Sequence, residues 1–443
     1  MSFLGLKLSR LHKGFLGQAS GQLVQIAVRL LEVPVFLHFW SPERYGEWLV
    51  VTAIPGMLTL GDFGVSQSAV RGMTTASAAG RFDQALAIFQ SGALVTFLFS
   101  LAFSSLFVVA SLFHAVGGAI GLTLSFAPTL LSLVAILAAY TMLSMQSLLL
   151  FGVLQSAGRY PLGFLLLGAT RLLEFTFVVL ALASGGGAAT AALAMLAAQL
   201  ASYLSLLASA RHHAPWLRLG AGSVSGRAVR ALIKPSLSFS AFPLAQAISL
   251  QFLRLLLGGT LGPGAVVIFT THRQFGRLLN TVSNLMLSVQ AELGLAFGGG
   301  HVERFKDLAV RTFHILAVTG GAAFIVLLLL SHRVFSLWTV GRVPFDFWLF
   351  LTLSLASLGE LLWRGALAPA MATNRHERGA LAYLAVQLLC IPAILVSIRY
   401  GLEAVGVVIC AAEFAVLAFV LFEFRRITGV PLRTLLVFRP GRA

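Results

Sequence analysis

The chain has 443 residues, of which 58% are hydrophobic and only 10% are charged, and its mean hydropathy is +0.92. A soluble domain carries about 25% charged residues, so the composition excludes a soluble globular protein and predicts that lipid surrounds most side chains. The long Leu- and Ala-rich runs lack the alternation of an outer-membrane barrel. Transmembrane helices are therefore the predicted spanning structure.

Runs of the length that crosses a bilayer, roughly 20 apolar residues, predict an all-α membrane protein with twelve transmembrane helices, six in each half of the chain. The first six are expected at 14–39, 45–68, 86–113, 121–155, 161–183 and 188–210. The second six are expected at 235–258, 264–294, 311–330, 344–372, 380–398 and 402–424. The predicted domains are a lobe over 1–210, a basic linker over 211–234, a second lobe over 235–424 and a basic tail over 425–443.

The basic residues divide unevenly between the two sides of this scheme. Most lie in the two tails, in the 211–234 linker and in alternate short loops, whereas the other side carries only Arg44, Arg333, Arg342 and Arg399. The positive-inside rule then predicts that both termini are cytoplasmic, which requires an even number of spans. The net charge of +16 is explained by contact of these loops with anionic lipid, and we expect no nucleic acid partner.

Motifs for enzymatic chemistry are lacking in this sequence. Cys390 and Cys410 lie inside apolar runs, where neither their spacing nor their context suggests a disulfide or a metal site. There is no nucleotide-binding P-loop. The longest loop on the less basic side, between Ser331 and Val343, offers no acid–base set. We therefore expect no catalysis, no metal and no cofactor.

The first predicted helix carries a polar stripe. Gln18, Gln22, Gln25, Arg29 and Glu32 follow steps of 4, 3, 4 and 3 residues, which places them on one helical face. Such a face must contact water or protein. Two interpretations stay open: one wall of a hydrated substrate cavity, which we favour, or a polar seam between helices.

A second polar stripe lies in the eighth predicted helix. Arg273, Arg277, Asn280 and Asn284 follow steps of 4, 3 and 4, and Arg254 lies in the seventh helix. No acid lies near these arginines along their own helices, so we predict that they face a ligand; the alternative is snorkelling to an interface. Arginine suits bidentate phosphate binding, so the predicted ligand is anionic.

The acids within the spans are candidates for ion coupling. Three of them, Glu32, Glu174 and Glu360, stand three or four residues from Arg29, Arg171 and Arg364, at spacings that allow contact on a helix. For the pairs of Glu174 and Glu360 we favour structural neutralisation.

Two further acids complete the coupling candidates. Asp62, near the end of the second helix, is either a structural cap or a coupling group. Glu413, in the middle of the last helix, is either a proton carrier or a protonated structural acid.

Four short motifs occur in order along the chain: Ser41-Pro42-Glu43-Arg44-Tyr45-Gly46-Glu47-Trp48, Leu60-Gly61-Asp62-Phe63-Gly64-Val65 with Arg71, Phe269-Thr270-Thr271-His272-Arg273-Gln274, and Ala372-Thr373-Asn374-Arg375-His376. On these motifs the chain resembles the polysaccharide transport family of oligosaccharide-lipid (O-antigen type) flippases. That family belongs to the superfamily that includes MATE exporters and the lipid II flippase.

The resemblance implies two six-helix bundles in a MATE-like V, with helices one, two, seven and eight lining a central chamber that opens alternately to each side. The implied cargo is a polyprenyl-pyrophosphate-linked oligosaccharide, moved to the outer leaflet of a bacterial inner membrane. A proton or sodium ion is the implied coupling ion, and polysaccharide polymerase machinery is a possible partner. Because Glu32 stands beside Arg29, the coupling site departs from the family pattern.

Three other functions are weighed against this one. A cation-coupled drug or metabolite exporter of the same superfamily would favour an acid-rich, aromatic-lined cavity. A membrane-embedded polysaccharide polymerase or ligase would need catalytic groups on a sizeable outer loop. A scaffold or passive lipid scramblase would need no ion gradient.

Overall fold

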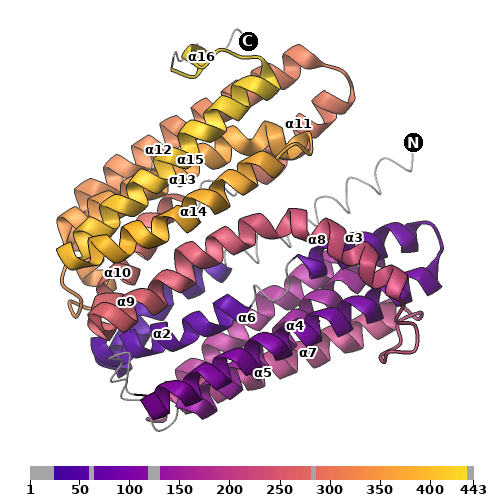
Figure 1. The fold of residues 1–443 in the computed structure, drawn as a ribbon, viewed down its shortest axis with the longest axis horizontal. Coiled ribbons are helices and arrows are strands. Elements are labelled where there is room, and N and C mark those ends of the chain that lie inside the picture. Colours follow the sequence, from indigo (N-terminus) through magenta and orange to yellow (C-terminus); the bar gives the residue numbers. More distant parts are fainter. Residues whose placement is uncertain (1–23, 59–63, 118–129, 281–285, 437–443) are drawn as a thin grey trace. The chain divides into compact units, whose positions relative to one another are not determined.

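The computed structural model describes residues 24–58, 64–117, 130–280 and 286–436. Within these residues the chain is helical and forms no strand (Figure 1). The predicted all-α membrane fold is confirmed.

The chain divides by its contacts into two compact units, which we call unit 1, Met1–Pro263, and unit 2, Gly264–Ala443. The helices of unit 1 cover residues 24–39, α2 (Pro42–Leu58), α3 (Val65–Ala78), α4 (Phe82–Gly117), α5 (Leu130–Ser156), α6 (Tyr160–Ala183), α7 (Ala188–His213), α8 (Gly226–Ala247), the π-helical turn η3 (Ile248–Phe252) and α9 (Leu253–Leu261). Because α8 packs on α3 and α4, and α9 packs on α2, the seventh predicted span belongs to unit 1 by contact. The division into lobes over 1–210 and 235–424 stays a prediction.

Unit 2 begins with α10 (Pro263–Gly276), which runs into a 3₁₀ turn over 277–280. Its other helices are α11 (Met286–Gly298), α12 (Val302–Trp338), α13 (Phe347–Ala372), α14 (Glu377–Ser397), the 3₁₀ turn η5 (Ile398–Tyr400), α15 (Leu402–Thr428) and α16 (Arg433–Leu436). Helix α13 packs against both α12 and α15. This places α13 inside the unit, where its polar residues are shielded from lipid.

Eight helices in the described part of the chain are long and apolar enough to cross a bilayer. They match the predicted spans three to seven, nine, eleven and twelve, so the protein is a multi-pass integral membrane protein.

The other four predicted spans are not among these eight helices. The first begins outside the described residues, and the second includes residues 59–63, which also lie outside them. The eighth changes to 3₁₀ geometry after Gly276. The tenth, α13, is a continuous helix whose hydropathy is lowered by Glu360 and Arg364.

Two helices begin earlier in the chain than the apolar runs predicted. Helix α12 begins at Val302, nine residues before the predicted span, because its first turns are polar and carry the ion pairs Lys306–Glu303 (2.9 Å) and Arg311–Asp307 (2.8 Å). In the predicted linker, α8 already begins at Gly226, because the Ser225 hydroxyl caps it by accepting from the backbone N–H of Ala228 at 3.1 Å.

Two adjacent glycines of α12 give a matched test of helix packing. A Cβ at Gly320 would lie 2.5 Å from Cδ2 of the fully buried Leu361, whereas one at Gly321 would meet nothing within 4 Å. We expect Gly320→Ala to lower the free energy of unfolding by about 1–3 kcal/mol through overpacking. Gly321→Ala should leave it unchanged or raise it by about 0.5–1 kcal/mol, because alanine favours helix. Thermal unfolding of both purified variants checks this, and equal midpoints would contradict the α12–α13 contact.

Candidate functional site

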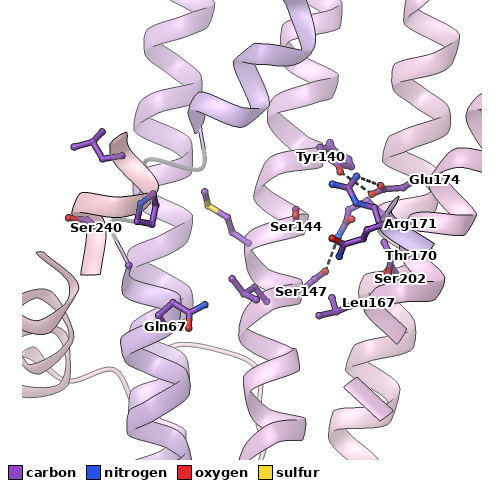
Figure 2. A pocket seen from close by; sticks show the side chains of 17 residues that line it. Gln67, Tyr140, Ser144, Ser147, Leu167, Thr170, Arg171, Glu174, Ser202 and Ser240 are labelled. Carbon is purple, nitrogen blue, oxygen red and sulfur yellow. Dashed lines mark hydrogen bonds and ion pairs between the residues drawn. The ribbon is translucent and has the colours of Figure 1, made fainter. Parts of the chain in front are cut away.

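A cavity of about 410 Å³ lies inside unit 1, between the helix of residues 24–39 and helices α3, α5, α6, α7 and α8 (Figure 2). Its lining combines apolar side chains with many groups that form hydrogen bonds. The polar lining residues are Gln25, Gln67, Tyr140, Ser144, Ser147, Thr170, Arg171, Glu174, Gln199, Ser202 and Ser240. Polar groups on six helices of an otherwise apolar unit thus converge on one hollow.

The charged wall of this cavity is built by α5 and α6. Glu174, only 5% exposed, accepts hydrogen bonds from the Tyr140 hydroxyl at 2.9 Å and from Arg171 Nη1 at 2.8 Å. The predicted contact between Arg171 and Glu174 is confirmed. Because the Arg171 side chain is 52% exposed, its guanidinium remains accessible while Glu174 is held beneath it.

The rest of the polar lining is neutral. Gln199 donates to the Ser147 hydroxyl at 2.9 Å, and the hydroxyls of Thr170 and Ser202 hydrogen-bond to each other. Figure 2 shows Gln67 on the side of the cavity away from this wall. Amides and hydroxyls both donate and accept hydrogen bonds, so this lining can exchange partners with a bound polar ligand or with water.

The predicted residues Arg29, Glu32 and Arg254 also belong to unit 1. The positive charges of Arg171, Arg254 and Arg29 all act on Glu32. No acid lies near Arg254 along its own helix, but the charge of Glu32 acts on it from another helix.

The π-helical turn η3 sets the position of Arg254. It brings Gln251 so close to α2 that a Cβ on Gly56 would collide with the Gln251 side chain. Arg254 Nη1 in turn donates to Gln251 Oε1 at 3.4 Å. Such π turns inside α-helices are frequent at functional sites.

Unit 2 contains a second charge cluster, centred on Glu360 of α13. This carboxylate, 3% exposed, accepts from Arg277 Nη1 (2.9 Å) and Nη2 (3.4 Å), from Arg364 Nε (3.0 Å) and Nη2 (2.8 Å), and from Asn280 Nδ2 (2.8 Å). The predicted pairing of Glu360 with Arg364 is confirmed. No acid lies near Arg277 along its own helix, but Glu360, 83 residues later in the chain, pairs with it from α13. We call Arg277, Glu360 and Arg364 the arginine–glutamate triad.

The triad keeps an excess of positive charge. Its side chains are unequally buried: Glu360 is 4% exposed, whereas Arg277 is 27% and Arg364 34% exposed. Arg273, on α10, is itself buried, with its guanidinium 5.8 Å from the Phe269 ring centre, and the charges of Arg277, Glu360 and Glu413 act on it. Three guanidiniums therefore face two carboxyl groups.

Glu413 of α15 is the fifth member of this cluster and is 3% exposed. Its Oε2 accepts from the Trp363 indole N–H at 2.8 Å, and its Oε1 accepts from Gln387 Nε2 at 3.4 Å. In the part of the chain that the structure describes, no group of three or more His, Cys, Asp or Glu side chains could hold a metal ion.

Four of the predicted site residues, Gln18, Gln22, Asp62 and Asn284, lie outside the described residues. Their roles in substrate binding and ion coupling stay predictions.

Several lining residues of the unit 1 cavity escaped the sequence analysis, chiefly Ser144, Ser147, Gln199 and Ser202. A signal was present, because the two residues of each pair, Ser144 with Ser147 and Gln199 with Ser202, are three residues apart on a mostly apolar helix. It is weak, since serine often bonds its own helix backbone, as Ser147 does to the Leu143 carbonyl at 2.8 Å.

The helices are arranged as in the MATE transporters of the MOP superfamily. The similar solved structures include an inward-facing multidrug resistance MATE transporter (15% identity, TM-score 0.70, 92% of this chain and 94% of that chain). An outward-facing form (14%, TM-score 0.67) and a MOP superfamily transporter from Pyrococcus furiosus Vc1 (14%, TM-score 0.67) each match over 95% of both chains. At these identities the likeness establishes the fold. No family model and no curated protein sequence matches the chain.

Proposed function

We propose that this protein is a flippase that moves a polyprenyl-pyrophosphate-linked oligosaccharide from the cytoplasmic to the outer leaflet of a bacterial inner membrane. The cargo crosses by alternating access coupled to a proton or sodium gradient. Both termini are cytoplasmic, and polysaccharide polymerase machinery receives the product. The observation that carries the proposal is the arginine–glutamate triad, in which two partly exposed guanidiniums share one buried carboxylate on the tenth predicted span.

The charge balance favours an anionic cargo. An arginine at mid-bilayer costs roughly 2.5–3.5 kcal/mol on insertion scales, so a cluster of cations there favours an anionic ligand. The unit 2 cluster contains the three guanidiniums of Arg273, Arg277 and Arg364 and the two carboxyl groups of Glu360 and Glu413. A pyrophosphate supplies the missing negative charge, and its oxygens match the planar N–H pairs of arginine.

The unit 1 cavity supports a sugar-bearing headgroup. Its volume of about 410 Å³ lies in the range of small-molecule sites, roughly 300–1,000 Å³. The amides of Gln25, Gln67 and Gln199 and the serine hydroxyls offer exchangeable hydrogen bonds to sugar hydroxyls. The prenyl chain remains in lipid.

Export of a cationic drug, the main alternative, fits these sites less well. A cationic cargo would favour exposed acids and aromatic walls, yet Glu174 and Glu360 are both covered by arginine. Tyr140 is the one aromatic residue described in the lining of the unit 1 cavity. The Pyrococcus furiosus transporter is described as having a binding pocket of reverse polarity that suggests a different function. This precedent is consistent with a difference in pocket polarity between proteins of this fold.

Native mass spectrometry of the protein purified in mild detergent tests the cargo class. The proposal predicts a bound species whose fragments contain a polyprenyl diphosphate with attached sugars. Retention of this adduct should fall in Arg364→Ala and persist in Arg426→Ala, a partly exposed arginine of α15 that pairs with Glu423. Bound organic cations, with no diphosphate lipid, would favour the drug exporter instead.

A further inference from the structure

Glu413 differs from three other buried glutamates, Glu174, Glu360 and Glu423, in the nature of its partners. Glu174, Glu360 and Glu423 each lie within 4.0 Å of an arginine nitrogen. Glu413 is equally buried, but among the described residues its carboxyl group is bonded only by the neutral donors Trp363 and Gln387. A buried carboxylate without an ion partner is expensive in a membrane interior, and a bound proton removes that cost.

Charged and titratable groups reach Glu413 from every helix around it. They are Glu360 and Arg364 on α13, Tyr383 and Cys390 on α14, Arg273 and Arg277 on α10, and Cys410 on α15 itself. The carboxylate of Glu360 disfavours a second negative charge, whereas the arginines favour it. Reversible proton binding requires such opposing influences on one carboxyl group.

We propose that Glu413 is a proton-binding site within unit 2, and that its protonation is the coupling event of the transport cycle. The second part rests on the proposed function; the first does not. A proton fits better than a sodium ion, because both groups on the carboxylate are N–H donors. Sodium, a hard cation, needs several oxygen ligands.

The two donors respond differently when the carboxylate takes up a proton from water to become a carboxylic acid. The indole of Trp363 can only donate, so Oε2 stays its acceptor and the proton resides on Oε1. The amide of Gln387 can turn over and present its own oxygen to that proton. Gln387, on α14, is thus a positioning residue. The orientation of its amide depends on whether the Glu413 carboxyl group carries a proton.

The proton site is linked to the arginine–glutamate triad through α13. Trp363, which bonds Glu413, is adjacent in sequence to Arg364, which bonds Glu360, and the Arg364 guanidinium lies 5.2 Å from the Trp363 ring centre. A change in the Trp363 contact therefore moves the same helical turn that positions the guanidinium. This is the physical route by which a proton on Glu413 changes the affinity of the triad for an anion.

The proton site can be tested without any lipid cargo. The experiment is infrared difference spectroscopy of the protein in liposomes, comparing spectra in acid and in alkaline buffer. The wild type should show the C=O stretch of a buried carboxylic acid that disappears on alkalinisation. Glu413→Gln should lose that band, and Glu423→Gln, a matched change of a buried but ion-paired acid on the same helix, should keep it. A band of unchanged intensity in Glu413→Gln, or no such band in the wild type, would overturn the site.

Coupling is tested separately, in proteoliposomes supplied with a polyprenyl-diphosphate oligosaccharide. Glu413→Gln should exchange this lipid at equal pH as the wild type does, and should lose accumulation driven by a pH gradient. Gradient-driven accumulation by Glu413→Gln would refute the coupling role. If the wild type does not carry the lipid while the infrared band behaves as expected, the cargo assignment fails and the proton site stands.

Discussion

Arg277→Ala and Arg364→Ala are each expected to weaken binding of a polyprenyl diphosphate by about 10- to 100-fold. A hydrogen bond to a charged group contributes about 1.5–3 kcal/mol, and about 1.4 kcal/mol corresponds to a tenfold change in affinity. Both guanidiniums are partly exposed and keep N–H groups beyond those that bind Glu360. The measurement is a titration of each purified variant with a short-chain polyprenyl diphosphate, compared with the corresponding monophosphate.

Two controls separate binding from folding in this series. Arg277→Lys and Arg364→Lys retain the charge next to Glu360 but lose the planar pair of donors, so they should fold normally and still bind the diphosphate more weakly. Arg426→Ala changes an arginine at the end of α15 and should bind as the wild type does. Wild-type affinity in both alanine variants would remove the triad from cargo binding.

Glu360→Ala is expected to be the most destabilising single change in unit 2, by about 3–5 kcal/mol. Removing the central carboxylate leaves Arg277, Arg364 and Asn280 without their shared acceptor, and breaking a buried ion pair from one side has a cost of this size. Thermal unfolding in detergent, followed by tryptophan fluorescence, measures the loss. Glu423→Ala is the control: the partners of Glu423 are 49% and 64% exposed, so about 1 kcal/mol or less is expected.

A compensated variant distinguishes charge from packing. Replacing the whole triad by apolar side chains (Arg277→Met, Glu360→Leu and Arg364→Met) removes all three of its charges at once. Such replacements are often neutral or stabilising, so this variant should recover most of the stability lost in Glu360→Ala while binding no diphosphate. If it unfolds as readily as Glu360→Ala, the stability effect does not come from unpaired charge.

Whether the sequence predicted a contact depends on how far apart its two residues are along the chain. The contacts of Arg171 with Glu174 and of Glu360 with Arg364 were predictable, because helix geometry alone brings residues three or four apart together. The contact of Arg277 with Glu360 was not, since its partners are 83 residues apart and no local rule selects one acid from several. For the same reason, the sequence did not show that the charge of Glu32 acts on Arg254 from another helix.

The fold was more predictable than the cavity, for a related reason. Long apolar runs define membrane spans without any knowledge of packing. The unit 1 cavity depends on single Ser, Thr and Gln side chains from six helices, and their convergence is a property of tertiary structure. Hydropathy also misses backbone changes inside a span, such as the 3₁₀ turn after Gly276 and the π-helical turn at Gln251.

Translocation in proteoliposomes tests the central claim most directly, namely that membrane-embedded arginines carry an anionic lipid. The substrate is a fluorescent polyprenyl-diphosphate oligosaccharide, and the readout is its accessibility to a quencher that does not cross the membrane. We predict that the wild type moves this lipid between leaflets, that free polyprenyl diphosphate competes and a hydrophobic organic cation does not, and that Arg364→Ala moves it far more slowly. Competition by the cation, or equal rates for the wild type and Arg364→Ala, would contradict the account.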